Sequence, residues 1–131
     1  MYSFEEIKER IRSFEFPESF DTIVAVANGG IIPAALLNQK LGVTFEVIKL
    51  SLRDANQTPM YDAPQLLEPI RFDPKGKRIL LVEDRVKTGA TLNYAKDLLR
   101  QQGATVKTFA VNGPADYSLF DTACFKFPWI L

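Results

Sequence analysis

The chain has 131 residues, of which 47% are hydrophobic, and its 16 Lys and Arg residues balance 16 Asp and Glu residues. This length fits a single domain over residues 1–131, and the zero net charge provides no general attraction to nucleic acid or to a membrane surface. With no histidine and one cysteine, Cys124, the chain lacks the residues for an internal disulfide, a Cys/His zinc site or a histidine-dependent nucleophile.

The first residues, MYSFEEIKER, carry charge from Glu5 onward, which is unlike a signal peptide, and no apolar run reaches the roughly 20 residues of a membrane span. We therefore expect a cytoplasmic protein. Ser3 followed by Glu6 is typical of a capping box, which reciprocally satisfies amides at a helix start. Together with apolar residues at helical spacing, it predicts a helix over residues 3–14: Phe4, Ile7, Ile11 and Phe14.

A strand, a glycine turn, a helix and a second strand are predicted next. Residues Thr22–Ala27 are rich in β-branched side chains and stop before a pair of glycines. Ile31–Leu41 has helical character and is followed by Gly42, a residue suited to end a helix. The following apolar run predicts a strand over Thr44–Leu50.

Residues 51–77 interrupt this regular pattern. They contain four prolines and mixed charges and show no sustained hydrophobic period. A stretch of this length within a small domain is either a functional lid or binding loop, or a loop that contains a short hairpin. The sequence leaves both interpretations open.

The remaining residues return to alternating strands and helices. We expect strands over Arg78–Val82, Val106–Val111 and Ala123–Phe127, and a helix over Thr91–Arg100. This alternation predicts an α/β fold with a parallel, doubly wound sheet. In such sheets ligands bind beyond the carboxyl ends of the strands, where the turns at residues 28–30 and 83–91 fall.

The second of these turns joins two acids to a phosphate-binding pattern. Glu83 and Asp84 end an apolar strand, where burial without partners would be costly, so they either cap or pair locally or meet a ligand. The residues KTGAT, 87–91, offer a glycine, two hydroxyls and the amides of a helix start, which suit a phosphate. Carboxylates suit sugar hydroxyls or a divalent cation. A phosphorylated ribose would satisfy both halves of the pattern, because its hydroxyls suit the carboxylates and its phosphate suits the turn.

The segment ILLVEDRVKTGAT, residues 79–91, resembles the phosphoribosyl pyrophosphate (PRPP) motif of the type I phosphoribosyltransferases. The segment VAVANGGIIPAALLNQKLG resembles their pyrophosphate loop, and FKFPWIL resembles the tail of xanthine and guanine enzymes. The resemblance extends over roughly residues 20–131. It implies a Rossmann-like domain with a mostly parallel sheet flanked by helices, a flexible loop over residues 51–77 and a small hood over residues 112–131.

The resemblance also implies a role for individual residues. Glu83, Asp84 and Lys87 form the catalytic set, and Asp84 holds Mg²⁺ while the acid pair binds the ribose hydroxyls. Asn28 and Gly29 contact the pyrophosphate across a cis peptide. Asn112 and Trp129 contact the base, although Trp129 is equally an aromatic of the core or of a dimer contact. The full PRPP-binding set is Asn28, Gly29, Arg53, Glu83, Asp84, Arg85, Val86, Lys87, Thr88, Gly89, Ala90 and Thr91.

Three positions depart from the family pattern. Asn28 stands where many members have Arg or Lys on the pyrophosphate, and Lys87 stands where hypoxanthine-guanine enzymes have an acid. Asn112 and its neighbours replace a base-reading lysine. Arg53 is the nearest candidate in the loop for a pyrophosphate contact.

Two functions follow from this pattern. The first is an enzyme that transfers the 5-phosphoribosyl group from PRPP to a nucleobase of the purine type, with Mg²⁺ as cofactor. The second is a regulatory module that binds PRPP or a nucleotide with weak or no turnover. For either, we expect small-molecule partners and a homodimer, with no nucleic acid and no membrane.

Overall fold

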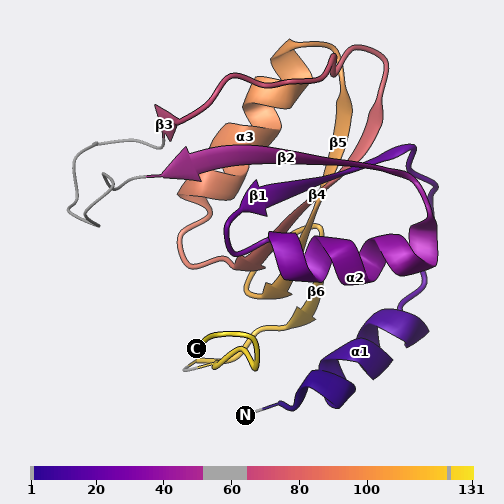
Figure 1. The fold of residues 1–131 in the computed structure, drawn as a ribbon, viewed down its shortest axis with the longest axis vertical. Helices are drawn as coiled ribbons and strands as arrows, with labels where there is room; N and C mark the ends of the chain where they lie inside the picture. Colours follow the sequence, from indigo (N-terminus) through magenta and orange to yellow (C-terminus); the bar gives the residue numbers. More distant parts are fainter. Residues whose placement is uncertain (1, 52–64, 124) are drawn as a thin grey trace.

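The structure is a computed structural model that describes residues 2–51, 65–123 and 125–131 (Figure 1). Residues 52–64 of the loop predicted over residues 51–77, among them Arg53, lie outside the described residues, as does Cys124. The elements, in chain order, are α1 Phe4–Ser13, β1 Thr22–Ala27, α2 Ile31–Leu41, β2 Thr44–Ser51, β3 Gln65–Leu66, β4 Arg78–Arg85, α3 Ala90–Gln101, β5 Thr105–Asn112 and β6 Tyr117–Phe120.

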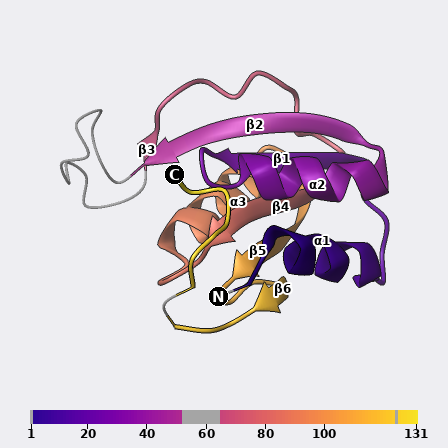
Figure 2. The ribbon, with the colours of Figure 1, turned by 60° about the horizontal axis from the view of Figure 1, so that its bottom comes forward.

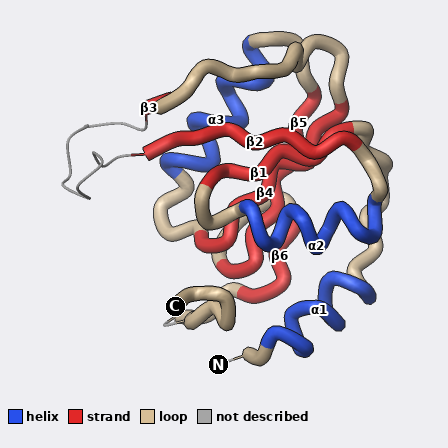
Figure 3. Tube along the Cα trace, in the orientation of Figure 1, coloured by secondary structure: helices blue, strands red, loops and turns tan. Residues whose placement is uncertain are grey.

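The strands form one sheet in the order β3-β2-β1-β4-β5-β6 (Figure 3). Strands β2, β1, β4, β5 and β6 run parallel, and the short β3 pairs antiparallel with the end of β2. The predicted fold class, a mostly parallel sheet flanked by helices, is confirmed.

Helices cover both faces of the sheet, and the alternation of side chains along β4 shows how each face acquires its own core. Leu80 and Val82 pack with α1 and α2, whereas Ile79 and Leu81 pack with α3. All four side chains are fully buried, as expected for a central parallel strand. Figure 2 shows α1 and α2 on one side of the sheet and α3 on the other. The burial of apolar side chains on both faces of the sheet stabilises the assembled strands.

The first helix forms as its sequence predicts. The Glu6 amide donates to Ser3 Oγ at 3.1 Å, and the Ser3 amide donates to Glu6 Oε1 at 3.2 Å. Ile7 and Ile11 are buried on the inner face of α1. The capping box and the apolar face are therefore both confirmed.

The predicted strand over Ala123–Phe127 is wrong. Among the described residues the last strand is β6, Tyr117–Phe120, and the segment from residue 125 onward packs by its aromatic side chains instead of by a backbone ladder. Phe125 and Phe127 are both buried in the core on the α1 side. A strand-like apolar run can thus satisfy burial without pairing, which periodicity alone does not distinguish.

One further boundary differs from expectation. Strand β4 continues to Arg85, so Glu83 and Asp84 belong to the strand and not to the turn after it. The pairing of β2 with β3 agrees with a short hairpin in the loop of residues 51–77.

No helix within the described ranges is long and apolar enough to cross a membrane.

Gly30 allows the start of α2 to lie against the sheet. A Cβ atom at Gly30 would lie 2.3 Å from the Val82 carbonyl oxygen and 2.8 Å from that of Val26. We expect Gly30→Ala to lower the free energy of unfolding by about 3 kcal/mol, because backbone atoms cannot move aside. Gly42→Ala is the control, since that residue has φ 63° but open space around it, and should cost about 1 kcal/mol. Urea unfolding measures both, and equal losses would contradict the steric argument.

Candidate active site

The turn after β1 touches the end of β4 at the carboxyl edge of the sheet. A Cβ atom on Gly29 would lie 2.6 Å from Asp84 Oδ1, so only glycine leaves room for the acid there. The peptide bond between Ala27 and Asn28 is cis, as the family resemblance implies. The structure thus brings the predicted pyrophosphate turn against the predicted ribose site.

The acid pair is held by the backbone at the end of β4. The Asp84 amide donates to Glu83 Oε1 at 2.9 Å, and the Arg85 amide donates to Asp84 Oδ1 at 2.6 Å. Burial, with a smaller contribution from the neighbouring Asp84 charge, raises the pKa of Glu83 to about 9. Glu83 is therefore protonated at neutral pH until a hydroxyl donor or a cation arrives to favour its charged form.

A pocket of 330 Å³ lies beside the acid pair at the start of α3. Gly89, with φ 85°, ends the turn, and α3 has no side-chain cap there and no acid in its first turn. The Ala90 amide donates to Thr88 Oγ1 at 3.2 Å. The helix start and the neutral first turn suit an anion. The pocket is lined by Glu83, Arg85, Val86, Lys87, Thr88, Gly89, Ala90, Thr91 and Leu92.

Arg85 connects the end of β4 to the C-terminal segment. Its guanidinium donates to the Phe125 carbonyl oxygen and lies 5.2 Å from the centre of the Phe127 ring. Lys87, by contrast, is exposed and is one of the residues that line the pocket. A PRPP contact of Arg85 stays a prediction, and its observed contacts are with Phe125 and Phe127.

Asn112 has a similar positioning role. Its Nδ2 donates to the Thr122 carbonyl oxygen at 2.9 Å, and its Oδ1 accepts from the Thr122 amide at 2.9 Å. The side chain is buried, which favours support of the hood over direct contact with a base. A second pocket of 340 Å³ lies here, between the end of β4 and the hood. Its lining includes Arg85, Val86, Lys87, Asn112, Asp121, Thr122 and Phe125.

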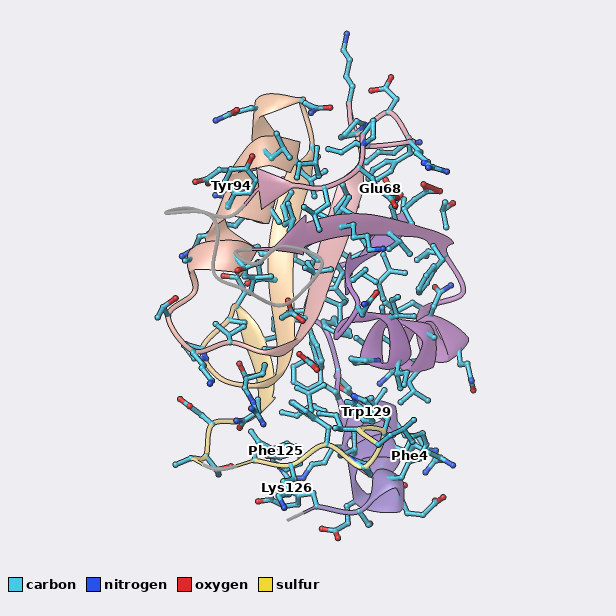
Figure 4. The ribbon with its side chains drawn as sticks, turned by 60° about the vertical axis from the view of Figure 1, so that its left-hand side comes forward. Phe4, Glu68, Tyr94, Phe125, Lys126 and Trp129 are labelled. Carbon is cyan, nitrogen blue, oxygen red and sulfur yellow. The ribbon has the colours of Figure 1, made fainter. Side chains whose placement is uncertain are left out.

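Trp129 packs against the N-terminal helix. Its ring stacks on Phe127 with centroids 5.1 Å apart, and it meets the edge of Phe4 at 6.1 Å (Figure 4). The indole Nε1 is buried and has no hydrogen-bond partner among the described residues. These contacts favour the interpretation of Trp129 as a core aromatic, and its contact with a base stays a prediction.

Sequence reasoning missed two cations near the first turn. Lys49 and Arg71 line a pocket of 380 Å³ that also includes Asn28. Lys49 could have been found, because it stands at the carboxyl end of a predicted strand, where ligands of parallel sheets bind. Arg71 lies in an irregular segment, and its sequence carries no such signal.

The acid pair suits a Mg²⁺ ion whose remaining ligands come from water and from substrate phosphates. The described residues contain no group of three or more metal-ligating side chains. Mg²⁺ commonly takes one or two carboxylates and completes its shell with water and substrate phosphates. Glu83 and Asp84 are the residues that would hold this ion. In Asp84, Oδ1 already accepts a hydrogen bond from the Arg85 amide.

The raised pKa of Glu83 predicts a pH dependence of stability. Between the ordinary pKa of 4.5 and about 9, the folded protein holds a proton that the unfolded chain has lost. Without divalent cations, stability should therefore fall as pH rises through this range. Glu83→Gln should flatten this slope, whereas the exposed control Glu15→Gln should keep it. Urea midpoints at several pH values measure the slope, and parallel slopes for both variants would disprove the assignment.

Comparison with known proteins agrees with this geometry. The family model described as "Phosphoribosyl transferase domain" matches residues 5–128. An adenine phosphoribosyltransferase of Salinispora tropica is 30% identical over 119 residues, which cover 83% of this chain and 61% of that protein. A xanthine-guanine phosphoribosyltransferase of Idiomarina loihiensis is 28% identical over 82 residues, which cover 63% of this chain and 50% of that protein. The chain thus spans about half to three fifths of the length of these relatives.

A solved structure extends the similarity over nearly the whole chain. The purine phosphoribosyltransferase of Pyrococcus horikoshii has a TM-score of 0.80 and 27% identity, covering 98% of this chain and 91% of that one. The turn after β1, the acid pair that it touches and the anion pocket therefore lie in a known fold. This chain belongs to the phosphoribosyltransferase family.

Proposed function

We propose that the protein transfers the 5-phosphoribosyl group from PRPP to a nucleobase and releases pyrophosphate. The observation that carries this proposal is the contact between Gly29 and Asp84, which places the first turn, the acid pair and the anion pocket side by side. PRPP carries, in the same order, a pyrophosphate, two ribose hydroxyls and a 5'-phosphate. The three parts of the site therefore match the three parts of one substrate.

In this proposal the chain acts by positioning and charge. The amides at the start of α3 hold the 5'-phosphate, and Glu83 and Asp84 accept hydrogen bonds from the ribose hydroxyls. As the base attacks C1' and pyrophosphate leaves with inversion, positive charge develops on the ribose ring, and the carboxylates stabilise it. Bound Mg²⁺ would neutralise charge on the pyrophosphate.

We propose that the base is a purine. It would bind in the pocket between residues 85–87 and 121–125. The names of the relatives support this choice, since they include xanthine-guanine and adenine enzymes and a purine enzyme of solved structure. Proposed finer properties are a cytoplasmic location and a homodimer. The exposed apolar side chains of Ile31, Ile32 and Val47 are available for such a contact.

A regulatory module that binds PRPP or a nucleotide without turnover is the second candidate. The observation in its favour is Lys87, which lines the pocket beside the hood and cannot accept a proton from a base as an ordinary ammonium group. The ribose and phosphate contacts would be the same in both candidates. Only the transferase would turn PRPP and a base over, so an assay of turnover distinguishes the two candidates.

Pyrophosphate release tests the transferase directly. The protein is mixed with PRPP and Mg²⁺, and xanthine, guanine, hypoxanthine, adenine, uracil and orotate are supplied one at a time. We expect release that depends on one or two of the purines. Release with uracil or orotate alone would contradict the purine assignment. PRPP binding without release with any base would favour the regulatory module.

Asp84→Asn tests the ribose site. The substitution keeps the shape but removes the charge that stabilises the transition state, so we expect kcat/KM for PRPP to fall by about 100-fold or more. Asp97→Asn on the exposed face of α3 is the matched control and should leave activity unchanged. Steady-state kinetics measure both variants. Normal activity of Asp84→Asn would remove Asp84 from the site.

A further inference from the structure

The pocket of 340 Å³ between the end of β4 and the hood, called here the hood pocket, has an excess of positive charge. Arg85 and Lys87 come from the end of β4 and the turn after it, and residues of the hood and Val86 complete the lining. Asp121, an exposed residue of the hood, is the one acid among the described residues of the lining. Within the described ranges, neither Arg85 nor Lys87 makes an ion pair with a carboxylate. Both cations are therefore available to a negatively charged ligand.

Arg85 is the cation whose position is fixed. Its guanidinium donates to the Phe125 carbonyl oxygen and lies 5.2 Å from the centre of the Phe127 ring, so its charge is held toward the hood. Arg85 also lines the pocket at the start of α3, but both of these contacts of its charged end are with the hood. A guanidinium has five N–H donors in a plane, and within the described residues its hydrogen bond is the one to Phe125. Donors thus remain for a ligand in the hood pocket.

The described residues of the hood pocket give a base few ways to lose a proton. Asn112 engages both ends of its amide with the Thr122 backbone, and the Lys87 ammonium has no free electron pair. The exposed Asp121 is the carboxylate that remains. A neutral base that attacks C1' through a ring nitrogen must give up a proton, which a general base normally accepts. An anionic base has already lost that proton, so it needs no acceptor.

We propose that Arg85 determines the specificity of the base site and selects a purine in its anionic form, an oxypurine such as xanthine. This assignment rests on the proposed transferase function and names its substrate class. A ring nitrogen of the anion forms the bond to C1', the bond from C1' to the pyrophosphate oxygen breaks, and the electron pair of that bond leaves with the pyrophosphate. The base becomes neutral and keeps its remaining protons, so the protein takes up none. Lys87 is then compatible with turnover.

The acidity of the purines separates the possible substrates. A ring N–H of xanthine is acidic enough to be partly ionised near neutral pH, whereas hypoxanthine and adenine stay neutral there. Hydrogen bonds between an anion and a guanidinium are about twice as strong as those between neutral groups. The hood pocket should therefore favour xanthine over hypoxanthine. The preference should grow as the pH rises, because a larger fraction of the xanthine is then ionised.

The test measures kcat/KM for xanthine and for hypoxanthine, with PRPP and Mg²⁺, at several pH values on both sides of neutrality. The ratio of the two values is the result to compare, because a pH effect on the PRPP site, such as that of Glu83, changes both alike. We expect xanthine to be favoured about tenfold or more above neutral pH, with a ratio that rises with pH. Arg85→Gln removes the charge but keeps a donor for the Phe125 carbonyl oxygen. It should lower the ratio about fivefold or more and leave KM for PRPP unchanged.

Three further variants complete the test. Arg85→Lys keeps the charge and should keep most of the preference, whereas a purely structural role of Arg85 would lower both values alike and leave the ratio unchanged. Arg78→Gln, at the exposed start of β4, is the matched control and should behave as wild type. Asp121→Asn should keep its turnover, because no proton has to be accepted.

The outcomes distinguish this assignment from the proposed function. A preference for hypoxanthine, a ratio that Arg85→Gln leaves unchanged, or loss of turnover in Asp121→Asn would overturn the assignment and leave the transferase intact. A wild-type protein that releases no pyrophosphate with any base would overturn both.

Discussion

The close approach of the first turn to the end of β4 is the constraint on which the rest of the site depends. At Gly30 the start of α2 comes so near the carbonyl oxygens of β1 and β4 that no Cβ atom fits, and at Gly29 the turn rests on the Asp84 carboxylate. Two glycines therefore let backbone and acid occupy space that side chains would otherwise fill. Because both strands are central and are buried over Thr22–Val26 and Ile79–Val82, this contact is held by the hydrophobic cores on both faces of the sheet.

The same contact creates an electrostatic arrangement suited to a substrate with charge at both ends. Glu83 and Asp84 stand in the middle, and burial keeps Glu83 neutral in the absence of a ligand. On one side of the acids is the start of α3 with its anion pocket, and on the other is the turn with Lys49 nearby. Acids between two anion sites would repel a simple phosphate, whereas a ribose between two phosphate groups gives them hydroxyl donors.

The two ends of the chain complete the molecule through aromatic contacts. Tyr2 stacks on Phe120 with ring centroids 3.9 Å apart. The rings of Phe4 and Trp129 meet edge to face. The described residues of the C-terminal segment form no further strand, so side chains and a few polar contacts hold them. Arg85 and Asn112 make those contacts from the ends of β4 and β5. The hood is therefore attached to the same strand ends that form the site.

The sequence alone determined the elements whose signals are local. The capping box of α1, the glycine at the end of α2 and the apolar strands follow from backbone preference and side-chain period, and the acid pair with its Thr-Gly turn indicated the family. Only the tertiary structure decided which groups meet. Strand register placed Lys49 opposite Ala27, and long-range packing gave Asn112 and Trp129 structural partners and removed the strand predicted over Ala123–Phe127. The physical reason is that register and packing join residues distant in the chain, which no local pattern encodes.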